Sequence, residues 1–222
     1  MRLYDLPPEL FQCSDFHIHT SYTDGSNTVY EYCQKAVENG LGAIAFSEHV
    51  RKDLQYDYSD LCNDVAKARE MFHELQIFIG CEAKVLNLDG ELDIPGSILG
   101  KMDFITAVYH GFPYDAKEEY LTSLRSMLSD PSVDIWGHPT LLPTRKRMPL
   151  YEGEIKDIVS LCIQNKVLIE RNIKYGLPDA GFVAIAKEMG ARFIIGSDSH
   201  SIRQLPNRPM IQEEWKWISR TY

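Results

Sequence analysis

The sequence is poor in the features that mark disulfide-bonded or thiolate-metal proteins. Its five cysteines (Cys13, Cys33, Cys62, Cys81 and Cys162) are odd in number, widely scattered and never in a C-x-x-C pair. This pattern disfavours a disulfide framework and a zinc site built from thiolates. We interpret the cysteines as reduced thiols and predict a cytoplasmic location.

Long hydrophobic runs are also missing. The apolar segments 42–46 and 104–108 end after a few positions, whereas a transmembrane helix needs about 18 consecutive apolar residues. The first eleven residues contain Asp5, Glu9 and two prolines, with no basic start followed by an apolar run. We therefore expect neither a signal peptide nor a membrane span.

Basic residues are outnumbered, with 23 Lys and Arg against 32 Asp and Glu and a formal net charge of −9. Extended nucleic-acid and acidic-membrane surfaces need a basic face that displaces counterions, so we expect neither partner. Any phosphate group that the protein handles must meet locally concentrated positive charge. The 222 residues, 44% of them hydrophobic, are otherwise those of an ordinary globular protein.

Short apolar runs and helix-like stretches alternate along the chain. Runs rich in Val, Ile and Phe predict strands at 13–19, 42–47, 77–82, 104–109, 133–137, 167–170 and 193–197. Most are followed by a predicted helix, at 28–39, 59–75, 117–128, 152–165 and 179–189. Segment 82–104 breaks the pattern, because Asp89-Gly90 indicates a hairpin turn and Pro95-Gly96 a loop, which leaves room for at most a short helix. With no low-complexity linker, we predict a single domain over residues 1–222.

Polar residues recur about every 30 residues, the size of one strand–helix–strand unit. They stand at the carboxyl ends of the predicted strands: His19, His49, Glu82, His110, His138, Glu170 and Asp198. In closed parallel barrels the loops at that end build the active site, whereas an open sheet uses a crevice. Since such residues follow every strand, we predict an α/β fold, a distorted, TIM-like (β/α)7 barrel with its site at the carboxyl ends of the strands.

Six of the seven histidines lie at or just past a predicted strand end, and only His73 does not. One such histidine could simply be a buried ring bonded to a carbonyl, but six at one level are hard to explain that way. Strand alternation predicts that His17 and His19 share a face with Asp15, with Phe16 and Ile18 on the other face. Imidazole and carboxylate ligands without cysteine suit catalytic zinc, manganese or iron.

The carboxylates allow two interpretations. Glu82 and Asp198 could form salt bridges with a lysine or arginine, but their sequence neighbours offer none. If Glu82 points into the cavity, its two oxygens could bridge two cations, and a buried carboxylate without such a partner would be costly. We favour the metal interpretation.

Together these motifs resemble the PHP family, the polymerase and histidinol phosphatase superfamily. The resemblance runs from residue 13 to 200 through Asp15-Phe16-His17-Ile18-His19-Thr20, Thr23-Asp24-Gly25, Ser47-Glu48-His49, Gly80-Cys81-Glu82, Tyr109-His110, Gly137-His138-Pro139 and Gly196-Ser197-Asp198-Ser199-His200. It implies a distorted seven-stranded barrel around three divalent metal ions (zinc, manganese or iron). The implied ligand sets are His17, His19, Glu82 and Asp198 for one ion, Glu82, His110 and His138 for a second, and Asp24, His49 and His200 for a third.

The sequence also departs from the family pattern. Many relatives have Thr-Asp-His where this chain has Ser47-Glu48-His49, and many have Glu-Ile-Asn where it has Glu170-Arg171-Asn172. If Glu170 points into the barrel, Arg171 points away from it. Amidohydrolases share the first His-x-His and the last aspartate but commonly place a lysine between metals, so Glu82 disfavours amide hydrolysis.

The resemblance implies hydrolysis of a small phosphate monoester by a hydroxide that bridges two metals, as in histidinol phosphatases. The alternatives are a nuclease-like phosphodiesterase acting on nucleotides or oligonucleotides, and a nucleotide-bound accessory module. A metal-loaded structural module fits least, since every ligand position is filled. No basic stripe or aromatic ladder for single strands is present, so we favour the monoesterase.

Roles around the metals follow from the same motifs. Glu82, Asp198, His17 and His19 are the predicted catalytic residues. Asp15 is predicted to orient an imidazole N–H from behind, and Glu48 is a second candidate partner of the ligands. The candidate phosphate donors are Arg145 and Arg203, which we favour, and Arg51 and Lys174, although each could be a plain solvated charge.

Some features leave alternatives open. Tyr109, Tyr114 and Tyr175 border the leaving group or simply pack in the core. The segment 210–220, with Trp215 and Trp217, covers the barrel or forms an interface, and the oligomeric state is not predicted.

Overall fold

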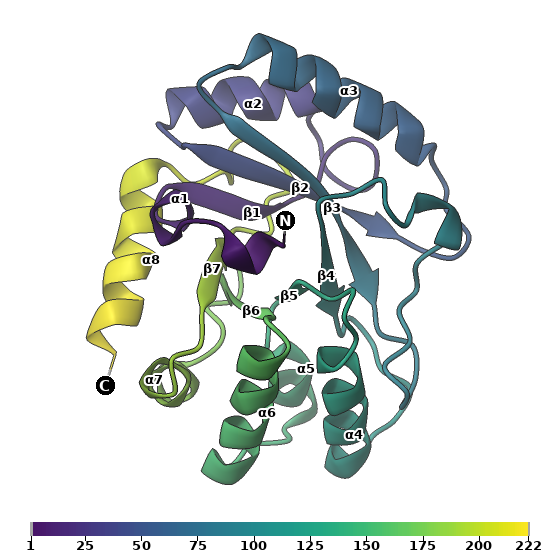
Figure 1. The fold of residues 1–222 in the computed structure, drawn as a ribbon, viewed down its shortest axis with the longest axis vertical. Coiled ribbons are helices and arrows are strands. Elements are labelled where there is room, and N and C mark those ends of the chain that lie inside the picture. Colours follow the sequence, from purple (N-terminus) through teal and green to yellow (C-terminus); the bar gives the residue numbers. More distant parts are fainter. Residues whose placement is uncertain (1, 222) are drawn as a thin grey trace.

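A parallel seven-stranded sheet forms the centre of the computed structural model, which describes residues 2–221 (Figure 1). The strands pair in chain order and are β1 (Ser14–Ile18), β2 (Ala43–Val50), β3 (Gln76–Lys84), β4 (Phe104–Val108), β5 (Ile135–Trp136), β6 (Leu168–Asn172) and β7 (Phe193–Gly196). The two edges of the sheet meet where the His19 N–H donates to the Ser199 carbonyl at 2.9 Å, beside a parallel bridge between Ile18 and Ser199. The predicted distorted (β/α)7 barrel is confirmed.

Helices surround the barrel, and each predicted helix is present. They are α1 (Pro8–Phe11), α2 (Val29–Glu38), α3 (Tyr58–Met71), α4 (Lys117–Leu128), α5 (Leu141–Lys146), α6 (Glu152–Gln164), α7 (Ala180–Glu188) and α8 (Arg208–Arg220). Helix α2 shows how the local sequence sets the ends of a helix. A capping box of Thr28 and Glu31 starts it, and Gly40 with φ 70° follows its end. Among residues 2–221, no helix is long and apolar enough to cross a membrane.

The connection from β3 to β4 is irregular, as predicted. An antiparallel bridge joins Val85 to Leu92, and the turn between them contains Gly90 with φ 76°. A short 3₁₀ helix, η2 (Gly96–Ile98), follows.

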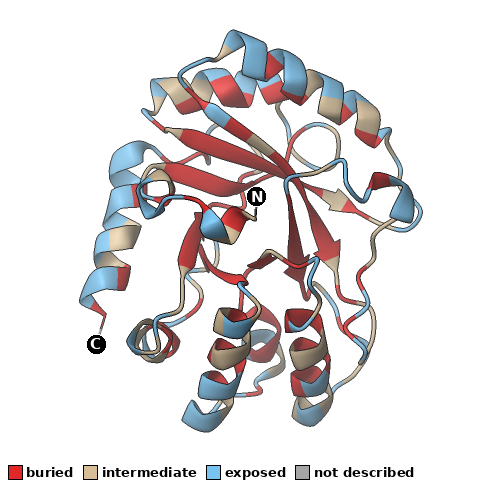
Figure 2. Cartoon of the chain, viewed as in Figure 1, coloured by how far each residue is buried: buried red, intermediate tan, exposed pale blue. Residues whose placement is uncertain are grey.

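Two apolar layers flank the barrel wall, and Figure 2 shows the strands buried almost throughout. The larger layer lies between the strands and the helices, and the smaller one fills the barrel interior. The interior layer takes residues from β1, β2 and β4 to β7, and the N-terminal segment closes it: Phe16, Ala45, Phe104, Ile135, Leu168 and Ile194, with Leu3, Leu6 and Phe11. This apolar plug occupies the amino ends of the strands, so the polar side chains collect at the opposite end.

Strand β1 departs from simple alternation. Its register against β2 shifts between Asp15 and Ile18, and Phe16 packs in the interior layer while Ile18 packs in the outer one. The predicted arrangement, with Phe16 and Ile18 on one face, is therefore wrong. An irregularity of this kind re-aims side chains, and here it brings His17 into the barrel directly after Phe16.

The C-terminal helix α8 packs on the outside of the barrel, against β1 and α7. Arg171 is buried, points away from the barrel interior as predicted, and donates to Glu214 at 2.9 Å and to the Pro178 carbonyl at 3.0 Å. Its guanidinium carbon lies 3.9 Å from the ring centroid of Trp217. Trp215 donates its indole N–H to the Phe11 carbonyl at 2.8 Å. The segment therefore covers the barrel, and an interface formed by its outer face stays a prediction.

Candidate metal centre

One buried carboxylate, that of Glu82 on β3, lies among five imidazoles. Its Oε1 is 2.8 Å from His138 Nε2 and 3.0 Å from His110 Nε2, and its Oε2 is 2.6 Å from His49 Nδ1. His17 and His19 lie slightly farther away, at 3.6 and 3.7 Å. These imidazoles come from the ends of β1, β2, β4 and β5, so the predicted meeting of strand ends is observed.

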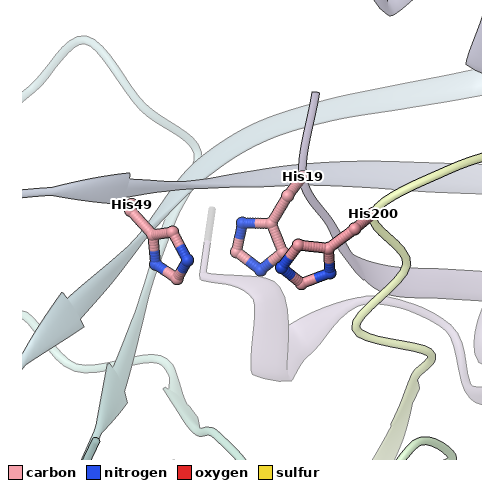
Figure 3. Close-up of side chains that lie close together, drawn as sticks. All are labelled: His19, His49 and His200. Atoms are coloured by element: carbon pink, nitrogen blue, oxygen red, sulfur yellow. The ribbon is translucent and has the colours of Figure 1, made fainter. Parts of the chain in front are cut away.

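The remaining predicted ligands complete the cluster. Asp198 Oδ1 lies 3.5 Å from His19 Nε2 and 3.4 Å from His200 Nδ1. Asp24 Oδ2 lies 3.4 Å from His49 Nε2 and 3.3 Å from His200 Nε2. Figure 3 shows His19, His49 and His200 converging from three different elements. All nine predicted ligand side chains thus meet in one site.

The residues fit divalent cations, judged by their own geometry. The Nε2 atoms of His17 and His19 are 3.1 Å apart, and those of His110 and His138 are 3.2 Å apart. Two nitrogens that share one tetrahedral ion at about 2.0 Å lie about 3.3 Å from each other. Glu82 Oε2 and His49 Nδ1 are both buried and, within residues 2–221, neither has a hydrogen-bond partner despite their 2.6 Å separation. Two buried ligand atoms this close together, without a hydrogen bond of normal geometry, fit a site that a cation would complete.

Three sets of donor atoms each lie within 4.8 Å of one another: those of His17, His19 and Glu82, those of His49, Glu82 and His110, and those of His19, His49 and His200. Each of these sets shares residues with the ligand sets that the resemblance implies, but none is identical to one of them. The assignment of particular residues to particular ions therefore stays a prediction.

The backbone is strained at two predicted ligands. His138 and Asp198 have φ values of 26° and 54°, in the left-handed region that non-glycine residues seldom adopt. Each follows its strand by two residues, β5 and β7 respectively. Strain of this kind persists only where the surrounding structure holds the residue in place, and it is frequent at active sites.

Burial and neighbouring charged groups shift the pKa values of the residues in the cluster. Burial opposes ionisation of Glu82, but contacts from His110 and His138 lower its pKa well below the usual range. Burial likewise opposes protonation of His17, but the neighbouring Glu170 carboxylate raises the pKa of His17 to about 10. For His19, burial dominates and lowers the pKa to about 4. The site thus combines an ionised central carboxylate with imidazoles of very different basicity.

Glu170 on β6 contacts the site, and our site prediction did not include it. It is buried, and its Oε1 lies 2.6 Å from His17 Nδ1. We predicted Asp15 for this role, and that prediction is wrong: Asp15 Oδ1 accepts the backbone N–H groups of His17 at 3.1 Å and Ser197 at 2.9 Å. Burial raises the pKa of Asp15 to about 6. The signal for Glu170 was its place in the series of strand-end polar residues.

Glu48 supports the loop that carries Asp24. Its carboxylate accepts the Thr20 N–H at 2.7 Å and the Thr23 hydroxyl at 2.5 Å. Burial raises the pKa of Glu48 to about 7. Glu48 therefore contacts the loop next to the ligands rather than an imidazole.

The candidate phosphate donors divide into two groups. Lys174 Nζ lies 3.2 Å from Asp198 Oδ2, and both Lys174 and Arg145 lie 5.5 Å from the ring centroid of Tyr175, which packs edge-on against His138. Arg51 lines a hollow of about 250 Å³ beside His49, although it also donates to the Val50 carbonyl at 2.7 Å. These three residues border the site.

Arg203 lies elsewhere. It is exposed and lines a separate hollow with Lys35, Glu38 and Met210, between α2 and α8. The geometry does not support the preference for Arg203 as a phosphate donor. The reason is the direction of the chain, because the segment after His200 turns outward towards α8.

The three tyrosines with two predicted alternatives have different surroundings. Tyr109 is buried, packs against Phe112 and Tyr120, and bonds Ser123 through its hydroxyl at 2.9 Å. Tyr114 packs against Phe112 with centroids 5.0 Å apart. Tyr175 borders the site.

Comparison with known proteins decides the family. A family model described as the PHP domain matches residues 15–174. The chain belongs to the PHP family. The match begins at Asp15 and ends at Lys174, so it includes every predicted metal ligand except Asp198 and His200, which follow β7.

Several curated relatives of this PHP protein are similar to it over most of its length. A probable phosphatase of Clostridium acetobutylicum is 27% identical over 210 residues, which cover 90% of this chain and 83% of that protein. A probable phosphatase of Acetivibrio thermocellus is 28% identical over 198 residues, covering 84% and 78%. The DNA polymerase/3'-5' exonuclease PolX of Bacillus subtilis is 25% identical over 199 residues, covering 86% of this chain and 35% of that protein.

The fold of the PHP protein is also that of a solved enzyme. The crystal structure of histidinol phosphate phosphatase from Lactococcus lactis, complexed with zinc, L-histidinol and phosphate, matches with a TM-score of 0.70. The match covers 95% of this chain and 94% of that one at 16% identity. At this identity the similarity is one of fold.

Proposed function

We propose that this PHP protein is a metal-dependent phosphatase that hydrolyses a small phosphate monoester. The coarser class is established: the chain is a phosphate ester hydrolase of the PHP family, and its relatives along nearly the whole chain are named probable phosphatases. The proposal concerns the monoester, the cations and the residues that act on them.

One observation carries the proposal, the position of the Glu82 carboxylate within 3.7 Å of five imidazoles. A single carboxylate surrounded by imidazoles, which bind metal in their neutral form, is arranged to hold more than one cation, because each oxygen faces a different set of nitrogens. Cations bound there would bind phosphate oxygens and lower the pKa of water towards neutrality. They would also supply the positive charge that an acidic protein needs in order to bind phosphate.

The chain's own residues would hold and orient the substrate. His17, His19, Asp24, His49, Glu82, His110, His138, Asp198 and His200 are the proposed metal ligands. Lys174, Arg145 and Arg51 lie on the rim, where an ammonium and two guanidinium groups could donate to the phosphate oxygens that face away from the metals. Tyr175, between Lys174 and Arg145, would border the leaving group.

A small leaving group, as in L-histidinol phosphate, is part of the proposal. The Lactococcus lactis enzyme was crystallised with zinc, L-histidinol and phosphate, which supports this substrate type because the two barrels share their fold over almost their full lengths. On the rim of this site, Lys174 and Arg145 would contact the phosphate, and Tyr175 would contact the small group esterified to it.

A phosphodiesterase is the second candidate, since the similarity to PolX covers 86% of this chain. The chain corresponds to only about a third of PolX, so the activity of the whole relative does not transfer by itself. Diester hydrolysis is nevertheless the natural competitor in a direct assay.

The test compares p-nitrophenyl phosphate with bis-p-nitrophenyl phosphate. The protein is stripped with a chelator, reloaded with zinc, manganese or iron, and assayed with each compound, with metal content measured in the same samples. We expect activity only after reloading and a kcat/KM for the monoester at least about ten-fold above that for the diester. Equal turnover of the two esters would overturn the monoester assignment, and full activity in the stripped protein would overturn the metal requirement.

A further inference from the structure

Glu170 contacts parts of the site that lie far apart in the sequence. Its Oε1 lies 2.6 Å from His17 Nδ1, and its Oε2 accepts the backbone N–H of His138. Oε2 also accepts the side-chain amide of Asn172 at 3.3 Å. The carboxylate thereby joins the end of β1, the loop after β5 and the end of β6.

The surroundings leave Glu170 little freedom. The residue is 1% exposed, and a buried carboxylate is tolerated only when it is paired and hydrogen-bonded. Gly196 on β7 faces it, and a Cβ at Gly196 would collide with Glu170 Oε1 and with the Cβ of His17. The glycine thus allows the carboxylate and the imidazole to approach each other.

The contact with His138 falls at a strained position. His138 has φ 26°, and its backbone N–H is held by Glu170 while its imidazole Nε2 faces Glu82 at 2.8 Å. A backbone held at an unfavourable φ needs a compensating interaction. The charge-assisted hydrogen bond from this N–H supplies one.

Asn172 extends the same network to the rim. Its side-chain oxygen accepts the Tyr175 N–H at 3.1 Å, and its backbone exchanges hydrogen bonds with Leu177 at 2.8 and 3.3 Å. This hairpin carries Lys174, whose ammonium lies 3.2 Å from Asp198. The network therefore reaches from two proposed metal ligands to the proposed phosphate donor.

We propose that Glu170 is a positioning residue that fixes His17 with its Nε2 towards the metals, holds the strained backbone of His138, and through Asn172 sets the hairpin of Lys174. A carboxylate that accepts the second ring N–H of a metal-binding histidine fixes both its tautomer and its orientation. This inference rests on the metal site of the proposed function, so its readouts are metal binding and ring protonation rather than turnover.

The first test measures zinc affinity by competition with a chromogenic chelator. Glu170→Gln keeps the shape of the side chain but removes the charge, and we expect its zinc affinity to fall about 10- to 100-fold. Glu170→Asp keeps the charge but is one methylene shorter, so it cannot span His17 and His138, and we expect a smaller loss. Wild-type affinity in Glu170→Gln would overturn the proposal.

Glu214→Gln is the matched control. Glu214 on α8 accepts a hydrogen bond from Arg171. Arg171 directly follows Glu170 on β6 and points to the opposite face of the strand. The same chemical change there should alter zinc affinity by no more than about two-fold. A loss equal to that of Glu170→Gln would mean that any disturbance of β6 weakens the site, and this too would overturn the proposal.

The second test needs no variant and therefore does not depend on whether Glu170→Gln folds. In the zinc-loaded wild-type protein, nitrogen-detected NMR of the histidine rings should show a proton on His17 Nδ1 and zinc on Nε2. Zinc on Nδ1 would overturn the proposal. Correct ring protonation and variant affinities without any phosphatase activity would instead refute the proposed function alone.

The third test addresses the hairpin. Asn172→Ala removes the link to Tyr175 but leaves the Glu170 contacts with His17 and His138, so zinc affinity should stay within about three-fold. We expect KM for p-nitrophenyl phosphate to rise more than kcat falls. A loss of zinc affinity as large as in Glu170→Gln, or an unchanged KM, would show that Glu170 does not position the Lys174 hairpin through Asn172.

Discussion

Glu82 Oε1 lies 2.8 Å from His138 Nε2, although 56 positions separate the two residues in the sequence. The contact bridges β3 and the loop after β5, with β4 between them in the sheet. Barrel curvature makes it possible, because side chains from non-adjacent strands point at the same axis. The proposed metal site depends on this closure.

Glu82→Gln is expected to abolish most of the activity. The amide lacks the charge that would hold cations between five imidazoles, so kcat/KM should fall at least about 100-fold, which corresponds to about 2.7 kcal/mol of transition-state stabilisation. Metal content per chain, measured by mass spectrometry, should fall as well. The control is Glu213→Gln on α8, whose partner is the exposed Lys216. Activity of Glu82→Gln equal to that of the control would contradict the central role of Glu82.

Lys174→Met is expected to raise KM for p-nitrophenyl phosphate about ten-fold, since a hydrogen bond to a charged group contributes about 1.5–3 kcal/mol. The change in kcat should be smaller, because Lys174 lies on the rim. Lys166→Met, which removes an exposed pair with Asp5, is the matched control. If Lys174→Met and the control give the same KM in steady-state kinetics, Lys174 does not bind phosphate.

Arg145 and Arg203 should differ when each is replaced by alanine. Arg145 lies beside Tyr175, whereas Arg203 lines the hollow between α2 and α8. We expect KM to rise about three- to ten-fold in Arg145→Ala and to stay within about two-fold of wild type in Arg203→Ala. The opposite order of effects would show that the loop after His200 turns towards the substrate.

Thr28→Ala tests the start of α2. The Thr28 hydroxyl accepts the Glu31 N–H at 3.3 Å, and loss of a helix N-cap costs about 1 kcal/mol. We expect a decrease of that size in the free energy of unfolding by urea. Thr122→Ala is the control, because Thr122 is exposed within α4 and only donates to the Glu118 carbonyl. Equal effects of both substitutions would argue against the cap.

Glu31→Gln should destabilise the protein in a pH-dependent way. The hydrogen bond from the Thr28 backbone N–H lowers the pKa of the Glu31 carboxyl below its usual value. A lowered pKa stabilises the folded state above the unfolded-state pKa, and this contribution is lost as the pH falls through the folded-state pKa. Urea titrations of wild type and variant should therefore differ at pH 7 and converge in acid. A difference independent of pH would mean that the charge of Glu31 does not matter.

The periodic pattern of the sequence was sufficient to predict the barrel. Apolar runs at intervals of about 30 residues define strand–helix units, and parallel strands place their carboxyl ends together. Most of the ligand candidates could be named for the same reason, since they stand at strand ends. Two predictions failed for local reasons. The irregularity in β1 places Phe16 inside the barrel, and the loop after His200 places Arg203 away from the site.

The sequence by itself determined the number of strands, the end of the barrel that bears the site and the types of its ligands, because side-chain chemistry and period are local properties. Only the tertiary structure decided the partners of the buried carboxylates: Glu170 for His17, backbone N–H groups for Asp15, and the Thr20–Thr23 loop for Glu48. Buried polar atoms must find partners within a few ångströms, and which partners lie within that distance depends on strand register and barrel closure.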